Sequence, residues 1–148
     1  MTVTNGILNF VNKREIQDLV SRYILALDEK CFNNKIFETI FAAQAGVKLP
    51  SIDSACGDID TIMNLHRTLL SQFESTHHMS SDLLVVFITS KEAAVRCNLS
   101  VIHRYNKVGK EKNGEEFLIV RDVLEGKVRQ IGNKWYFFDV CIKVIYRQ

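Results

Sequence analysis

This sequence contains little proline and has little net charge. Pro50 is the only proline among 148 residues, and the formal net charge at pH 7 is +2. A charge this small does not indicate a polyanionic partner. The one dense basic stretch, 107–112, is interrupted by Glu111 and contains no aromatic residue, which is typical of a solvated loop. We therefore expect no nucleic acid as a partner.

Long apolar runs are also absent. The longest, 83–88, is too short to span a bilayer, and Met1–Phe10 has neither a basic leader nor the apolar stretch of a signal peptide. We expect no membrane association and predict a cytoplasmic location. The cysteines at positions 31, 56, 97 and 141 form no C-x-x-C pair, which favours reduced, mostly packed thiols over zinc ligands or disulfides.

The motifs that would indicate a cofactor are missing as well. There is no G-x-G-x-x-G, no P-loop and no nucleophile elbow, so nucleotide cofactors, phosphoryl transfer and triad hydrolysis have no support in the sequence. No two histidines have the close H-x-x-x-H spacing of many metal sites. We expect neither a cofactor nor a metal ion.

Apolar residues recur at helical spacing through the first half of the chain and predict three helices. They cover residues 13–30, about 33–41 and 58–73. Asn33 or Asn34 is the expected cap of the second helix and Asp58 that of the third, because their side-chain oxygens accept from the free amides of a first turn. The segment 46–51, which contains Pro50, is expected to be an irregular or short extended link.

After residue 75 the chain is rich in β-branched and aromatic residues. Breaks at 90–92, 107–114 and 132–133 divide this part into four predicted strands. Short connections between consecutive strands favour antiparallel hairpins. We predict a single α+β domain over residues 1–148, in which three N-terminal helices pack on one face of a curved, mostly antiparallel sheet.

The strand predicted at 93–106 shows which face His103 occupies. Its odd-numbered positions are apolar apart from His103, whereas its even-numbered positions include Arg96 and Arg104. Because successive side chains of a strand point to opposite faces, His103 is expected on the apolar face, beneath the helices.

The last predicted strand, 135–148, is apolar on both faces. Strict alternation places Trp135 and Phe137 on one face and Phe138 and Val140 on the other. A single layer of helices covers only one face of a sheet. We therefore expect the outer face to meet another copy of the chain, most simply in a homodimer.

Short motifs are spread along nearly the whole chain. They are Arg22-Tyr23 and Leu27-Asp28 in the first helix, Phe41-Ala42, Thr76-His77-His78-Met79 opening the sheet, Ala93-Ala94 after a tight turn, and Lys134-Trp135 after Gly132-Asn133. In this order they resemble the SnoaL-like branch of the nuclear transport factor 2 superfamily. The resemblance implies a cone, in which three helices are wrapped by a strongly bent sheet around a central pocket.

The resemblance also implies an acid–base site. Members such as scytalone dehydratase and the polyketide cyclases use a first-helix aspartate and sheet histidines as general acid and base, and Asp28, His78 and His103 stand at those positions here. Removing a proton beside a carbonyl, or protonating a departing hydroxyl, requires a group that titrates near neutral pH, as histidine does. His78, oriented by Asp28, is the predicted proton carrier, with His103 or Tyr23 at the substrate oxygen.

Each of these residues also has an ordinary structural interpretation. Asp28 would end its helix in water, His78 would bond to backbone within its strand, and His103 would be a satisfied core residue. His77 is expected to point to the opposite face of its strand, into solvent, and His66 to be helical surface or core.

Tyr23, Val101 and Trp135 are the predicted ligand contacts. The Tyr23 hydroxyl either polarises a ligand oxygen or satisfies a buried partner. Val101 shares the apolar strand face with His103, and Trp135 with Phe137 forms either an aromatic wall of the pocket or ordinary core.

Together these observations predict a cofactor-independent enzyme of the dehydratase, cyclase or isomerase type, acting on a small apolar, cyclic or polyketide-like molecule. The alternative is a non-catalytic homo-oligomeric pocket protein that binds a hydrophobic ligand or serves as the partner subunit of a larger enzyme. Only the three titratable residues separate the two hypotheses.

Overall fold

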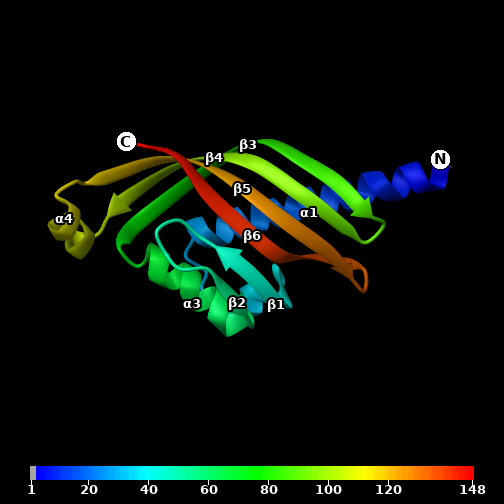
Figure 1. The fold of residues 1–148 in the computed structure, drawn as a ribbon, viewed down its shortest axis with the longest axis horizontal. Helices are drawn as coiled ribbons and strands as arrows, with labels where there is room; N and C mark the ends of the chain where they lie inside the picture. The colour runs from blue at the N-terminus through cyan, green and yellow to red at the C-terminus, as the bar shows by residue number, and fades with distance from the viewer. Residues whose placement is uncertain (1–2) are drawn as a thin grey trace.

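A six-stranded sheet carries the fold, and the long helices lie against one of its faces (Figure 1). The computed structural model describes residues 3–148. The helices are α1 Val3–Asp28, α2 Asn34–Phe37, α3 Ile59–Leu70 and α4 Lys107–Asn113. The strands are β1 Phe41–Lys48, β2 Ala55–Gly57, β3 Phe73–Thr89, β4 Glu92–Tyr105, β5 Phe117–Ile131 and β6 Lys134–Arg147. The predicted α+β class, with helices on a mostly antiparallel sheet, is confirmed.

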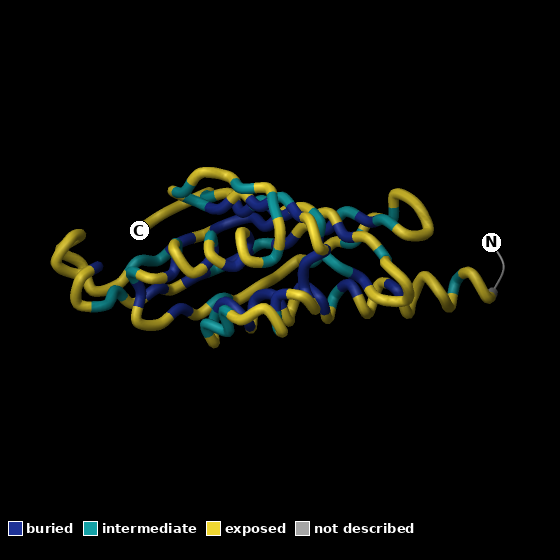
Figure 2. The backbone as a smooth tube through the Cα atoms, turned by 90° about the horizontal axis from the view of Figure 1, so that it is seen from below, coloured by how far each residue is buried: buried dark blue, intermediate teal, exposed yellow. Residues whose placement is uncertain are grey.

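The strand order is β2-β1-β6-β5-β4-β3. Strands β3 to β6 form the predicted antiparallel meander, and the parallel pair is β1 with β6. The buried positions form a layer between the sheet and the helices, whereas the first turns of α1 and most of α4 are exposed (Figure 2). The core therefore lies on the concave, helix-covered side of the sheet.

Helix α1 confirms the apolar stripe predicted for it. Ile16, Leu19, Tyr23 and Leu27 are buried, as their helical spacing requires. The helix begins at Val3, well before the predicted start, and its early turns expose apolar residues such as Phe10; Met1 and Thr2 lie outside the described residues. No helix within residues 3–148 is long and apolar enough to cross a membrane.

The second helix is much shorter than its apolar pattern predicted. Asn33 caps it by accepting a hydrogen bond from the Ile36 backbone N–H at 3.0 Å, but the helix ends at Phe37. Phe41 opens strand β1, and this strand also takes up the first part of the link predicted at 46–51. The prediction was wrong because β1 pairs with β6, which is distant in sequence, and local periodicity does not reveal that pairing.

Helices α3 and α4 each begin at a side-chain cap. Asp58 accepts from the Thr61 N–H at 2.9 Å, as expected, but α3 ends at Leu70 and the next apolar residue of its stripe, Phe73, already belongs to β3. The expected loop at 107–114 contains the short helix α4 instead. Asn106 caps it, and Gly114, with a left-handed φ of 73°, ends it.

Strands β4 and β6 differ in how well strict alternation predicts their buried faces. In β4 the odd-numbered positions from Ala93 to His103 are buried, as predicted. In β6 a shift of register after Phe137 adds one residue, so Trp135 and Phe137 share the inner face with Val140 and Ile142. The predicted division of this strand between two faces was therefore wrong.

Candidate active site

The carboxylate of Asp28 holds His78 through two groups at once. Its Oδ1 atom lies 2.6 Å from His78 Nδ1, and its two oxygens accept from the His78 backbone N–H at 3.0 and 3.2 Å. Asp28 is the last residue of α1, whereas His78 lies in β3, so the carboxylate also ties the helix to the sheet. Since a carboxylate accepts, Nδ1 carries the proton of this bond and Nε2 is the nitrogen left for other partners.

His103 faces the same interior from the neighbouring strand. Thr76 of β3 is its cross-strand partner, and the Thr76 hydroxyl oxygen lies 2.7 Å from His103 Nδ1. The ring stacks on Phe73 at 4.1 Å and meets the His78 ring edge-on at 6.1 Å between centroids. Burial, together with the nearby His78, lowers the pKa of His103 to about 4, so this imidazole is neutral at neutral pH.

His78 and His103 line one cavity of about 250 Å³ between α3, the β1–β2 loop and the inner face of the sheet. Most of the wall is apolar, including Leu27, Leu70 and Ile142. The side chain of His78 is only 6% exposed, so a group bound at its Nε2 would be largely shielded from water. Asp28 lies behind His78 and orients it, without being among the residues that line the cavity.

A second carboxylate, Asp122 of β5, was missed by the sequence reading. It is 8% exposed and lines the cavity. Desolvation raises its pKa to about 6, although the charges of His78 and Arg147 act in the opposite direction. The signal was present in the sequence: Val120, Asp122 and Leu124 alternate along a strand, and Asp122 interrupts an otherwise apolar face.

The three predicted ligand contacts lie in the core. The Tyr23 hydroxyl lies 2.7 Å from His66 Nε2, and the indole N–H of Trp135 donates to Asn12 Oδ1 at 3.3 Å. Val101 is fully buried. Within the described chain none of the three is among the residues that line the cavity.

His77 and His66 take the positions expected of ordinary residues. The His77 side chain is 71% exposed, and its Nδ1 lies 3.9 Å from Asp28 Oδ2. His66 is buried in α3. Within residues 3–148, no group of three or more histidine, cysteine or acidic side chains is placed to hold a metal ion. The four cysteines are free thiols.

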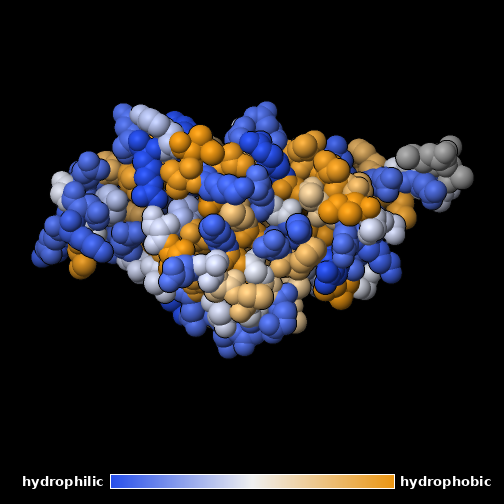
Figure 3. All heavy atoms as spheres, in the orientation of Figure 1, coloured by the Kyte–Doolittle hydropathy of each residue, from blue (hydrophilic) through white to orange (hydrophobic). Residues whose placement is uncertain are grey.

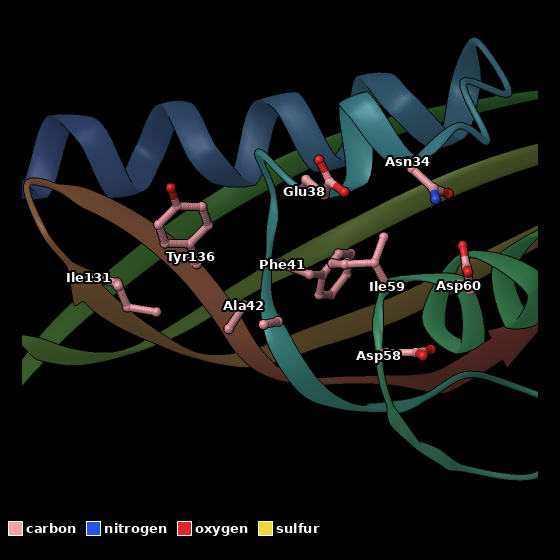
Figure 4. A pocket seen from close by; sticks show the side chains of 10 residues that line it. Asn34, Glu38, Phe41, Ala42, Asp58, Ile59, Asp60, Ile131 and Tyr136 are labelled. Carbon is pink, nitrogen blue, oxygen red and sulfur yellow. The ribbon is translucent and has the colours of Figure 1, made fainter.

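A second hollow, of about 510 Å³, lies between α2, the start of α3 and the β5–β6 hairpin. Figure 4 shows the carboxylates of Glu38, Asp58 and Asp60 around it, with Tyr136 on the strand side. Asp58 is already used as the cap of α3. None of the four histidines lines this hollow, so the proton-transfer groups gather at the smaller cavity instead.

Comparison with known proteins agrees with this architecture. The sequence profile of the SnoaL-like domain matches residues 11–138. The chain therefore belongs to the SnoaL-like domain family, as its motifs predicted. A comparison with curated proteins finds no significant sequence match.

Solved structures with the same fold include several whose names describe eliminations. A type 2 hexachlorocyclohexane dehydrochlorinase (LinA) is 14% identical, with a TM-score of 0.84 over 97% of this chain and 91% of its own. A proposed scytalone dehydratase from Novosphingobium aromaticivorans is 20% identical, with a TM-score of 0.80 over 97% and 90%. A proposed dehydratase of the NTF2-like family from Streptomyces avermitilis is 11% identical, with a TM-score of 0.76 over 92% and 98%. At these identities the comparison establishes the fold.

Proposed function

We propose that the cavity at His78 is the active site of a cofactor-independent enzyme of the dehydratase, cyclase or isomerase type. The observation that carries the proposal is the Asp28–His78 pair, because Asp28 occupies Nδ1 and leaves Nε2 as the base at the cavity. Nε2 takes a proton from a carbon beside a carbonyl, and the electron pair of the broken C–H bond moves into the carbonyl to give an enolate. Asp28 stabilises the imidazolium that forms.

His103 is assigned to the oxygen on which negative charge develops. Its Nδ1 is engaged by Thr76, so Nε2 is the nitrogen left for a ligand. The low pKa of His103 suits this role, because a neutral imidazole that donates a hydrogen bond does not compete with His78 for the transferred proton.

The substrate in this proposal is small and mainly apolar. A cavity of about 250 Å³ lies below the usual range for drug-sized ligands, and more than half of the residues in its wall are apolar. Dehydration and dehydrochlorination, the reactions named for the structural neighbours, both remove a proton from carbon, which is the step assigned to His78.

Proton exchange in a model ketone tests the proposal. 1-Indanone in D₂O exchanges the protons beside its carbonyl, and proton NMR follows the loss of their signal. Wild-type protein is expected to accelerate the exchange, and His78→Gln to lose about 10²-fold or more of that acceleration. Glu125→Gln is the control, since Glu125 is exposed on β5 and paired with Lys143, away from the cavity. Exchange no faster than in buffer, or a fully active His78→Gln protein, would contradict the proposal.

We also propose that a second copy of the chain covers the outer face of the sheet. Leu84, Val86 and Ile88 are each at least half exposed along β3, which is an edge strand. Figure 3 shows hydrophobic residues between hydrophilic ones over the strands. Exposed apolar residues grouped on one strand favour association. Light scattering is expected to find a dimer at micromolar concentration, and a stable 17 kDa monomer would refute this.

The non-catalytic alternative uses the same cavity and the same assembly. It would be favoured by an oligomer that binds apolar ligands without accelerating exchange in 1-indanone. A cytoplasmic location and the absence of a cofactor remain predictions from the sequence under both hypotheses.

A further inference from the structure

Asp122 is the carboxyl that lines the cavity, and the mechanism above does not use it. Its side chain is more than nine-tenths buried, and its Oδ1 is the one buried side-chain oxygen or nitrogen without a hydrogen-bond partner in the part of the chain that the structure describes. Its neighbours across the sheet are Leu99 on β4 and Val144 on β6, which offer no polar side-chain atom. A carboxyl in such surroundings lowers the stability of the fold unless a further partner arrives.

The position of Asp122 makes a ligand that partner. His78 pairs with Val101, and Val101 pairs with Val120, so Asp122 lies two strands from His78 and two residues further along the sheet. The strand spacing places their backbones roughly 10 Å apart across the sheet, before the offset along the strand is added. Both side chains line the same cavity. A molecule that reaches His78 Nε2 at one end can therefore reach the Asp122 carboxyl at the other.

We propose that Asp122 binds a hydroxyl group of the ligand, so that the cavity selects a small apolar molecule with a hydroxyl over a hydrocarbon of the same shape. A hydroxyl can donate to a carboxylate and can accept from a protonated carboxyl. It therefore satisfies Asp122 in either protonation state, whereas a carbonyl or a halogen only accepts. The assignment rests on the proposed function only in that it places the ligand in the cavity of His78.

The affinities of indane and 1-indanol test the assignment, because the two probes differ by one hydroxyl on the same ring system. Titrations followed by protein amide NMR are expected to show 1-indanol binding to wild type at least tenfold more tightly than indane. Asp122→Leu, which keeps a similar shape, is expected to reverse that preference. Glu125→Gln is the control, since Glu125 lies on the same strand but is paired with Lys143 on the exposed face.

The outcomes separate this inference from the proposed function. His78→Gln is expected to keep the preference for 1-indanol even if wild type fails to accelerate exchange in 1-indanone. Equal affinities for the two probes in wild type, or no binding of 1-indanol up to its solubility limit, would overturn the assignment. An Asp122→Leu protein that keeps the preference would also overturn it, because another group would then bind the hydroxyl. One that fails to fold would overturn it by assigning the carboxyl a structural role.

Discussion

Two buried histidines on the inner side of this fold, His66 and His78, are both bonded to side chains of α1, but they use their nitrogens differently. His66 Nδ1 lies 2.7 Å from the Ile62 carbonyl oxygen, which can only accept, so Nδ1 carries the proton. Its Nε2 consequently accepts from the Tyr23 hydroxyl. His78 uses Nδ1 for Asp28, and within the described residues no protein group bonds its Nε2.

The difference shows what distinguishes a structural histidine from a candidate catalytic one in the same cavity wall. The His66 ring is surrounded by Tyr23, Phe37 and Phe41, and burial lowers its pKa to about 4, so it is neutral and fully satisfied. His78 is nearly as well buried, yet it keeps one nitrogen for a ligand. Unused hydrogen-bonding capacity, more than burial, marks the group that can act on a substrate.

The largest expected effect on stability comes from replacing His66. His66→Leu removes the acceptor of the buried Tyr23 hydroxyl and leaves that hydroxyl without a partner, so the free energy of unfolding is expected to fall by about 3 kcal/mol. Urea denaturation followed by circular dichroism measures this loss in the free energy of unfolding. Tyr23→Phe, which removes only the donor, is the companion variant. A loss below about 1 kcal/mol in both would mean that the pair is not the structural element described above.

The next effect concerns the dependence of stability on pH at Asp122. Its folded-state pKa is raised from 3.8 to about 6, so the folded protein holds this proton more tightly than the unfolded chain. The resulting stability is fully present below pH 3.8 and is lost as pH rises through about 6. Relative to Asp122→Asn, wild type is expected to lose roughly 2–3 kcal/mol between pH 4 and pH 7. His66 and His103 have lowered pKa values, so their contribution to the stability of the fold is lost as pH falls. Wild type and Asp122→Asn both contain these histidines, so this contribution cancels in the comparison.

Denaturation series at pH 4, 5, 6 and 7 on the two proteins would provide that difference. A constant difference between wild type and Asp122→Asn would contradict the raised pKa. Asp139→Asn is a suitable control, because Asp139 is exposed on β6 and its substitution removes a carboxyl that lies outside the cavity.

The smallest expected effect on stability comes from replacing His78. His78→Leu is expected to change the free energy of unfolding by less than about 1 kcal/mol, since the backbone N–H at position 78 still donates to Asp28 after the imidazole is removed. The same denaturation experiment measures it beside His66→Leu. A loss as large as that of His66→Leu would assign His78 to the structural class.

Local pattern was enough for those parts of the fold where neighbours along the chain decide the outcome. Alternation placed His103 on the inner face of β4, and Asp58 capped α3 as its chemistry predicts. The same alternation also indicates that Asp122 lies on the inner face of β5. In β6 it failed, because one added residue after Phe137 reverses the faces of the residues from Asp139 to Val144.

Contacts between distant segments were beyond the reach of pattern alone. β1 is a strand because it pairs with β6, and Asp28 meets His78 across fifty residues of sequence. The second contact was predicted from the family resemblance, not from any periodicity. The Tyr23–His66 pair is a similar case, since nothing in either helix indicates that the other supplies its partner.

The bond from Asp28 to the backbone of residue 78 has an evolutionary consequence. Any amino acid except proline at position 78 presents the same backbone N–H to that carboxylate, so the join between α1 and β3 does not depend on which side chain stands there. Chemistry and architecture at this position are inherited separately. A lineage can exchange the imidazole for another group, or abandon it, and pass on the same scaffold with a different task.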